Sequence, residues 1–95
     1  MAGARIEVTP IDADTFRVVV SEGDGKTTHT VTVDPADYQR ISGGAVAAEE
    51  LVRRSFEFLL EHEAKESILR SFSLSVISRY FPEYEREMGR RLRRA

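Results

Sequence analysis

The spacing of apolar residues changes at Asp34-Pro35. Before this point apolar and polar residues alternate, whereas after it apolar residues recur three or four positions apart. Alternation is typical of a strand with one buried face, and the longer spacing is typical of an amphipathic helix. We therefore predict an α+β protein in which a small antiparallel sheet is followed by helices.

Three alternating stretches precede the change and predict a three-stranded antiparallel β-meander. The second stretch places Phe16, Val18 and Val20 on one face, whereas threonines line the outer face of the third. Glu22-Gly23-Asp24-Gly25 between them is typical of a tight hairpin turn, because glycine accepts positive φ. One face of this sheet is expected to be buried and the other wet. The strands are predicted over about 4–9, 15–22 and 26–33.

The second part of the chain carries start and stop signals for helices. Asp34 can cap the free amides of a helix whose first turn holds Pro35, and Gly43-Gly44 ends it. Pro82 interrupts the pattern near the end of the chain and allows a last helix over 83–93. Three or four α-helices, packed on one face of the sheet, are predicted over about 35–42, 47–64, 67–72 and 74–81.

The inward faces of these elements predict the hydrophobic core. Phe56 lies in the middle of the apolar stripe of the longest helix, the element best placed to cover the sheet. The predicted core residues are Ile6, Val8, Phe16, Val18, Val20, Val31, Val33, Tyr38, Leu51, Val52, Phe56 and Leu59.

Length and composition favour one globular domain over residues 1–95, with 41 % hydrophobic and 32 % charged residues. The chain has no cysteine, which excludes disulfides and thiolate zinc sites. No apolar run approaches the roughly 18 residues of a membrane span. The first residues also lack the apolar stretch of a signal peptide. We therefore expect a cytoplasmic protein that makes no membrane contact.

The formal net charge of −2 is unevenly distributed. Residues 1–85 carry 9 Lys and Arg against 15 Asp and Glu, a balance of −6. Residues 86–95 carry 5 Arg against 1 Glu, a balance of +4. The body of the protein should repel polyanions and the basic end should attract them. We expect the basic tail over 90–95 to fray.

No residue pattern indicates catalysis, a cofactor or a bound metal. His29 and His62 are the two histidines, and neither has other ligand-type residues at a characteristic metal-binding separation. Gly43-Gly44 lacks the rest of a phosphate-binding loop. The serines between 67 and 78 lack a nucleophile elbow. We therefore predict a protein that is not an enzyme.

The segment 67–81 resembles the two helices of a helix-turn-helix. In that motif Arg79 would point outward, toward a phosphate or a base edge, and the other arginines would add electrostatic attraction. The turn lacks the usual glycine, and glutamates flank the segment. A nucleic-acid-binding regulator is therefore kept as the alternative function. Its candidate contacts are Arg70, Arg79, Arg90, Arg91, Arg93 and Arg94.

Two stretches, Phe58-Leu59-Leu60-Glu61 and Tyr80-Phe81-Pro82-Glu83-Tyr84, carry a resemblance that covers most of the chain from Val31 onward. In these stretches the sequence resembles a family of short bacterial proteins of unknown function. The resemblance implies a free-standing bacterial protein and transfers no catalytic residue.

The end of the chain holds more large apolar side chains than one face of a small sheet can shelter. Intramolecular packing is the ordinary interpretation of such residues, and an exposed patch for a partner is the functional one. The open edges of the sheet offer a second route, by strand addition. Our leading hypothesis is a small non-enzymatic protein-interaction module that self-associates. Its candidate interaction surface consists of Phe72, Tyr80, Phe81 and Tyr84.

Overall fold

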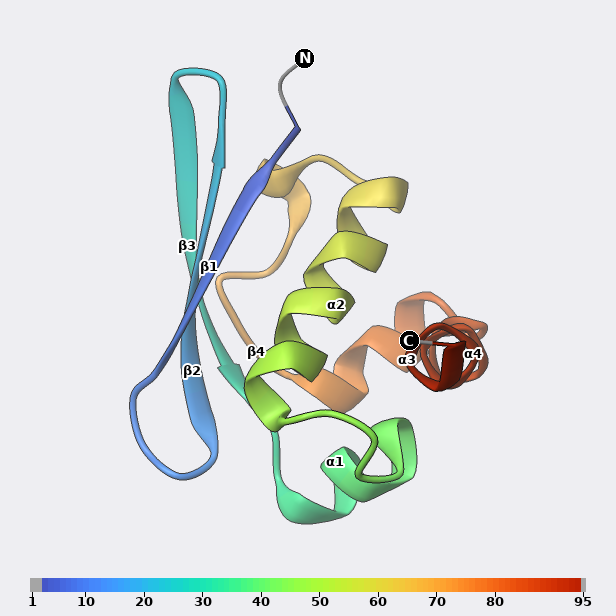
Figure 1. The fold of residues 1–95 in the computed structure, drawn as a ribbon. Coiled ribbons are helices and arrows are strands. Elements are labelled where there is room, and N and C mark those ends of the chain that lie inside the picture. Colours follow the sequence, from blue (N-terminus) through green and yellow to red (C-terminus); the bar gives the residue numbers. More distant parts are fainter. Residues whose placement is uncertain (1–2, 95) are drawn as a thin grey trace.

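The computed structural model of the protein describes residues 3–94 and confirms the α+β class. The sheet has four strands in the order β1-β2-β3-β4, and the helices lie on one side of it (Figure 1). The strands are β1 (Arg5–Pro10), β2 (Thr15–Glu22), β3 (Gly25–Thr32) and β4 (Ser71–Ser73). The helices are α1 (Pro35–Ser42), α2 (Ala48–His62), the 3₁₀ turns η1 (Lys65–Ser67) and η2 (Leu74–Val76), α3 (Ile77–Tyr80) and α4 (Tyr84–Arg94).

The predicted meander is confirmed as β1, β2 and β3, which pair antiparallel. In β2 the side chains of Val18 and Val20 are fully buried, and the alternate positions face outward. Gly23 takes a φ of 60° in the hairpin between β2 and β3, as the turn sequence predicted. The alternation therefore predicted the buried face of the sheet correctly.

The prediction of three strands, with a helix over 67–72, is wrong. This segment forms η1, an extended stretch and then β4, which pairs parallel to the end of β3. The backbone N–H of Thr30 donates to the Arg70 carbonyl over 2.7 Å. A short apolar run fits a strand or a helix equally well. The edge of β3 favours the strand here, because its backbone N–H and C=O groups pair with an extended segment and could not pair with a helix.

The other helix predictions are confirmed, with small changes at their ends. Asp34 caps α1 through a 2.9 Å hydrogen bond to the amide of Asp37, and Gly43 ends the helix with a φ of 62°. The helix predicted over 74–81 begins as η2 and continues as α3 to Tyr80. The last helix is present as α4, which the structure describes to Arg94. Ala95 lies outside the described residues, and fraying of the basic tail stays a prediction.

The core lies between the sheet, α2 and α4. All of the predicted core residues are buried except Tyr38, which is half-buried and donates its hydroxyl to the Val46 carbonyl. Several other buried residues were not predicted as core, and most of them lie on α4 and around α3. They are Ile41, Phe58, Ile68, Leu74, Ile77, Tyr84, Met88 and Leu92. In the described part of the chain no helix is long and apolar enough to cross a membrane, and the expected cytoplasmic location stays a prediction.

Candidate interaction groove

An apolar groove of about 350 Å³ lies between the end of α2, the segment 67–72 and α3. At its base Leu59, Ile68 and Ile77 are buried, whereas Phe72, Val76 and Phe81 are half-buried. Glu63 and Ser67 are the polar lining residues. A groove of this size with mostly apolar walls is the kind of site that receives an apolar side chain or a small ligand.

Two large apolar side chains of the groove lining face the solvent. Leu69 is 47 % exposed and Tyr80 is 65 % exposed. Among the described residues, Ile11 at 48 % is the other large apolar side chain exposed to this degree, and it lies in the β1–β2 connection. Single exposed apolar residues are ordinary on a protein surface, whereas these two adjoin the same apolar groove.

Buried His29 fixes the segment that carries Leu69. Its Nδ1 lies 2.7 Å from the Leu69 carbonyl oxygen and its Nε2 lies 2.8 Å from Thr27 Oγ1. Because a carbonyl only accepts, we assign a proton to Nδ1, which donates to Leu69. The ring is 1 % exposed and packs against Phe56, with 5.3 Å between centroids. This contact joins residues 40 positions apart, so no local sequence pattern predicts it.

The opposite wall is fixed by an aromatic cluster at the end of α2. The ring of Phe81 stacks on His62 with 4.9 Å between centroids and meets Phe58 edge-on at 5.8 Å. Phe58 is buried, although it is not among the predicted core residues. Phe81 thereby holds the end of α3 against α2, and the adjoining Tyr80 remains in the solvent.

Three of the four residues predicted as an interaction surface line the groove: Phe72, Tyr80 and Phe81. The prediction for Tyr84 is wrong, because its side chain is fully buried. Its hydroxyl lies 2.6 Å from Ser55 Oγ, which in turn donates to the Leu51 carbonyl. Burial raises the pKa of the Tyr84 phenol well above its ordinary value. Pro82 separates α3 from α4, and α4 begins at Tyr84 and places its side chain in the core.

Two of the six arginines proposed as nucleic-acid contacts, Arg90 and Arg91, are paired with carboxylates. Arg91 makes a bidentate pair with Glu61, at 2.7 and 2.9 Å, and a further 2.8 Å bond to Glu87. Arg90 also pairs with Glu87. Arg91 holds the pKa of both carboxyls below their usual value. Arg70, Arg79 and Arg93 are exposed, and the side chain of Arg94 lies outside the described part.

The helix-turn-helix interpretation of residues 67–81 is also wrong. The motif needs two successive helices, and the first of them is replaced here by η1 and β4. Only the second, ending at Tyr80, is helical. Arg79 is exposed on this short helix, as predicted.

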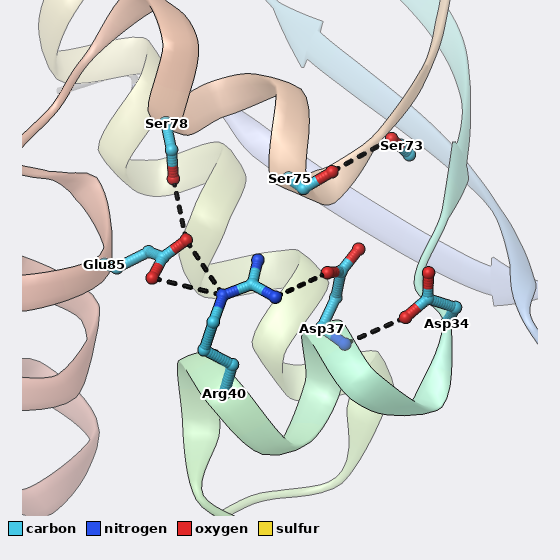
Figure 2. A network of polar contacts seen from close by, with 7 residues as sticks. All are labelled: Asp34, Asp37, Arg40, Ser73, Ser75, Ser78 and Glu85. Atoms are coloured by element: carbon cyan, nitrogen blue, oxygen red, sulfur yellow. Dashed lines mark hydrogen bonds and ion pairs between the residues drawn. The ribbon is translucent and has the colours of Figure 1, made fainter.

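A cluster of polar side chains joins α1, α3 and α4 (Figure 2). Arg40 bridges Asp37, at 2.9 Å, and Glu85, at 3.2 Å, while Ser78 donates to Glu85 over 3.0 Å. The hydrogen bond to Asp37 makes the largest contribution, together with Glu85, to raising the pKa of the Arg40 guanidinium. Glu85 is the one carboxylate bonded to a serine in this cluster, and its pairing with Arg40 makes it a poor general base. The cluster therefore ties three helices together and offers no activated nucleophile.

Among the described residues no group of three or more His, Asp or Glu side chains is arranged to hold a metal ion. No family model matches the chain, and neither a curated protein nor a solved structure matches it.

Proposed function

We propose that this chain is a small non-enzymatic protein-interaction module that self-associates through the apolar groove. The observation that carries the proposal is the pair of exposed apolar side chains, Leu69 and Tyr80, beside a groove of about 350 Å³. Leaving such side chains in water forgoes free energy that a partner surface would recover.

The expected size of the effect is modest. Complete burial of one large apolar side chain contributes about 1.5 to 3 kcal/mol, and both side chains are already partly covered. A two-fold dimer buries each of them twice, once from each copy. Association also costs translational and rotational freedom and side-chain order. We therefore expect a dimer whose population depends strongly on protein concentration.

Sedimentation equilibrium from about 1 µM to about 1 mM tests the proposal, because this range matches binding free energies of about 8 to 4 kcal/mol. Leu69→Ser should raise the dissociation constant about tenfold, since it removes roughly 1.4 kcal/mol of apolar contact. Ile11→Ser is the matched control, because Ile11 is 48 % exposed and Leu69 is 47 % exposed. A monomer at every concentration, or equal effects of the two substitutions, would contradict the proposal.

The nucleic-acid-binding alternative has weaker support. Its motif is not formed, and Arg90 and Arg91 are paired with carboxylates. Fluorescence anisotropy with duplex DNA and single-stranded RNA at about 50 and 200 mM salt measures the remaining electrostatic attraction. Binding that survives the higher salt and is lost in Arg79→Ala would favour the nucleic-acid-binding regulator over the self-associating module. We expect either no binding or weak binding that disappears at the higher salt.

A further inference from the structure

A cleft of about 330 Å³ lies between the end of α1 and α4, in a different place from the apolar groove. Arg40 of α1 and Arg86 and Arg93 of α4 line it, and we call it the arginine cleft. Among the described residues, Glu85 is the only acidic residue in its lining. Most of the other lining residues are small, so the long arginine side chains define its chemistry.

The two arginines that α4 places in this cleft are not used by the fold. Arg86 and Arg93 are exposed and, within residues 3–94, take part in no ion pair. They stand seven positions apart, about two helical turns, and therefore lie on the same face of α4. Arg90 and Arg91, between them in the sequence, pair with Glu87. An unpaired guanidinium has five N–H donors in a planar fork, which suits the oxygens of a phosphate group.

The carboxylate in the cleft is already bonded to other groups. The two Glu85 oxygens lie 3.2 and 3.3 Å from Arg40 Nε, and Ser78 donates its hydroxyl to one of them over 3.0 Å (Figure 2). Asp37 pairs with another nitrogen of the same guanidinium, at 2.9 Å. With the two unpaired arginines, three positive charges stand against two negative ones, a balance of +1. The cleft is thus locally positive in a chain whose formal net charge is −2.

Gly89 lies on α4 between the two unpaired arginines and also lines the cleft. After proline, glycine is the least favourable residue in the interior of a helix. Its φ is not positive, and a Cβ at this position would meet no backbone. The nearest atoms to such a Cβ are the guanidinium nitrogens of Arg93, at 3.5 and 3.6 Å. Neither the backbone nor the core therefore requires glycine here, and its effect is to leave the Arg93 guanidinium uncovered.

We propose that the arginine cleft binds a small ligand that carries a phosphate or diphosphate group. Arg86 and Arg93 donate to the phosphate oxygens, and Gly89 leaves room for them beside Arg93. The volume of the cleft, about 330 Å³, is at the lower end of the roughly 300 to 1,000 Å³ of small-molecule sites. This size favours a small molecule over a polymer. The inference does not depend on self-association, because the arginine cleft and the groove share no lining residue in the described part of the chain.

Isothermal titration calorimetry with inorganic pyrophosphate tests the proposal. The wild type should bind with a dissociation constant below about 1 mM at low salt, and added salt should weaken the binding. Arg86→Gln and Arg93→Gln should each raise the dissociation constant about tenfold, because each removes a charged donor from the site. Arg90→Gln is the matched control, since it removes the same charge from the same helix outside the cleft lining. It should change the dissociation constant by less than about threefold.

Gly89→Ala separates ligand binding from folding. Alanine favours the helix, so the melting temperature should rise by about 4 °C or more. Pyrophosphate binding should nevertheless weaken about threefold or more, because the new methyl group contacts the Arg93 guanidinium. A stabilised variant that binds pyrophosphate as the wild type does would overturn the role given to this glycine.

The other outcomes decide whether the site exists. Loss of binding in Arg86→Gln and Arg93→Gln, with Arg90→Gln close to the wild type, supports the cleft. No heat of binding with pyrophosphate up to about 10 mM, far weaker than useful affinities, overturns it. Equal effects of Arg90→Gln and Arg93→Gln also overturn it, because the arginines would then attract anions without a site. Duplex DNA that binds more tightly than pyrophosphate, with equal losses in those two variants, would assign them to a polyanion instead.

Discussion

At the scale of single residues, Phe56 joins the sheet to the wall of the groove. Its ring is fully buried, with centroids 5.3 Å from His29 on β3 and 6.0 Å from Phe72 on β4. Interior packing is dense, so the neighbours of a truncated side chain relax only in part. Phe56 therefore couples the stability of the fold to the shape of the groove.

Phe56→Ala should lower the free energy of unfolding by about 3 to 5 kcal/mol, as for other buried aromatic residues. Urea denaturation measures the loss, with Glu57→Ala as a control at the exposed neighbouring position. A change below about 1 kcal/mol, the level of ordinary surface substitutions, would mean that α2 does not pack on the sheet as described.

His29 is the second residue on which the groove depends. His29→Leu keeps an apolar side chain against Phe56 but removes the donor to the Leu69 carbonyl. A buried acceptor that loses its partner costs about 1 to 3 kcal/mol, and we expect a loss of stability in that range. Thr27→Val removes only the hydroxyl bonded to Nε2, and the loss should be smaller. Unchanged stability of His29→Leu in urea denaturation would show that the hydrogen bond does not hold the segment.

At the scale of elements, α4 closes the core that the sheet and α2 leave open. Its buried side chains, Tyr84, Met88 and Leu92, recur every four residues, and Arg91 ties the helix to Glu61 of α2. The same side chain also bonds Glu87 on α4 itself. Since the pKa values of both carboxyls are lowered in the fold, their contribution is present above the ordinary carboxyl pKa and is lost as pH falls through the folded value.

Arg91→Met should therefore destabilise the protein at pH 7 and lose this effect in acid. The difference in melting temperature from the wild type should shrink as pH falls below about 4, the ordinary pKa range of a carboxyl group. Arg93→Met is the control on the same helix, at an exposed position. A difference that stays constant down to pH 3 would rule out the carboxylates as the partners that matter.

Prediction from sequence worked where local signals decide the structure. Alternation gave β1 to β3, the Asp34 cap and Gly43 gave α1, and the apolar stripe gave α2. It failed at β4, because the edge of β3 and His29 lie far from this segment in the sequence and supply the bonds that select a strand. The groove itself was not predicted. Three of its lining residues, Phe72, Tyr80 and Phe81, were predicted as part of an interaction surface, whereas the positions of Leu69 and Glu63 depend on the fold of distant segments.

At the scale of the whole molecule, the sheet separates two different surfaces. The helices lie on one side of the sheet (Figure 1). The outward-facing positions of the strands carry mainly threonines and charged residues. An association driven by apolar burial should therefore involve the groove side and leave the open face of the sheet unchanged.

Amide NMR at two protein concentrations, one on each side of the dissociation constant, tests self-association through the groove. Dilution should shift the amide signals of residues around the groove, from Glu63 through the 67–72 segment to Phe81. Signals from the open face, such as Glu7 and Arg17, should stay in place. Dilution shifts confined to that face, or none at any concentration, would contradict self-association through the groove.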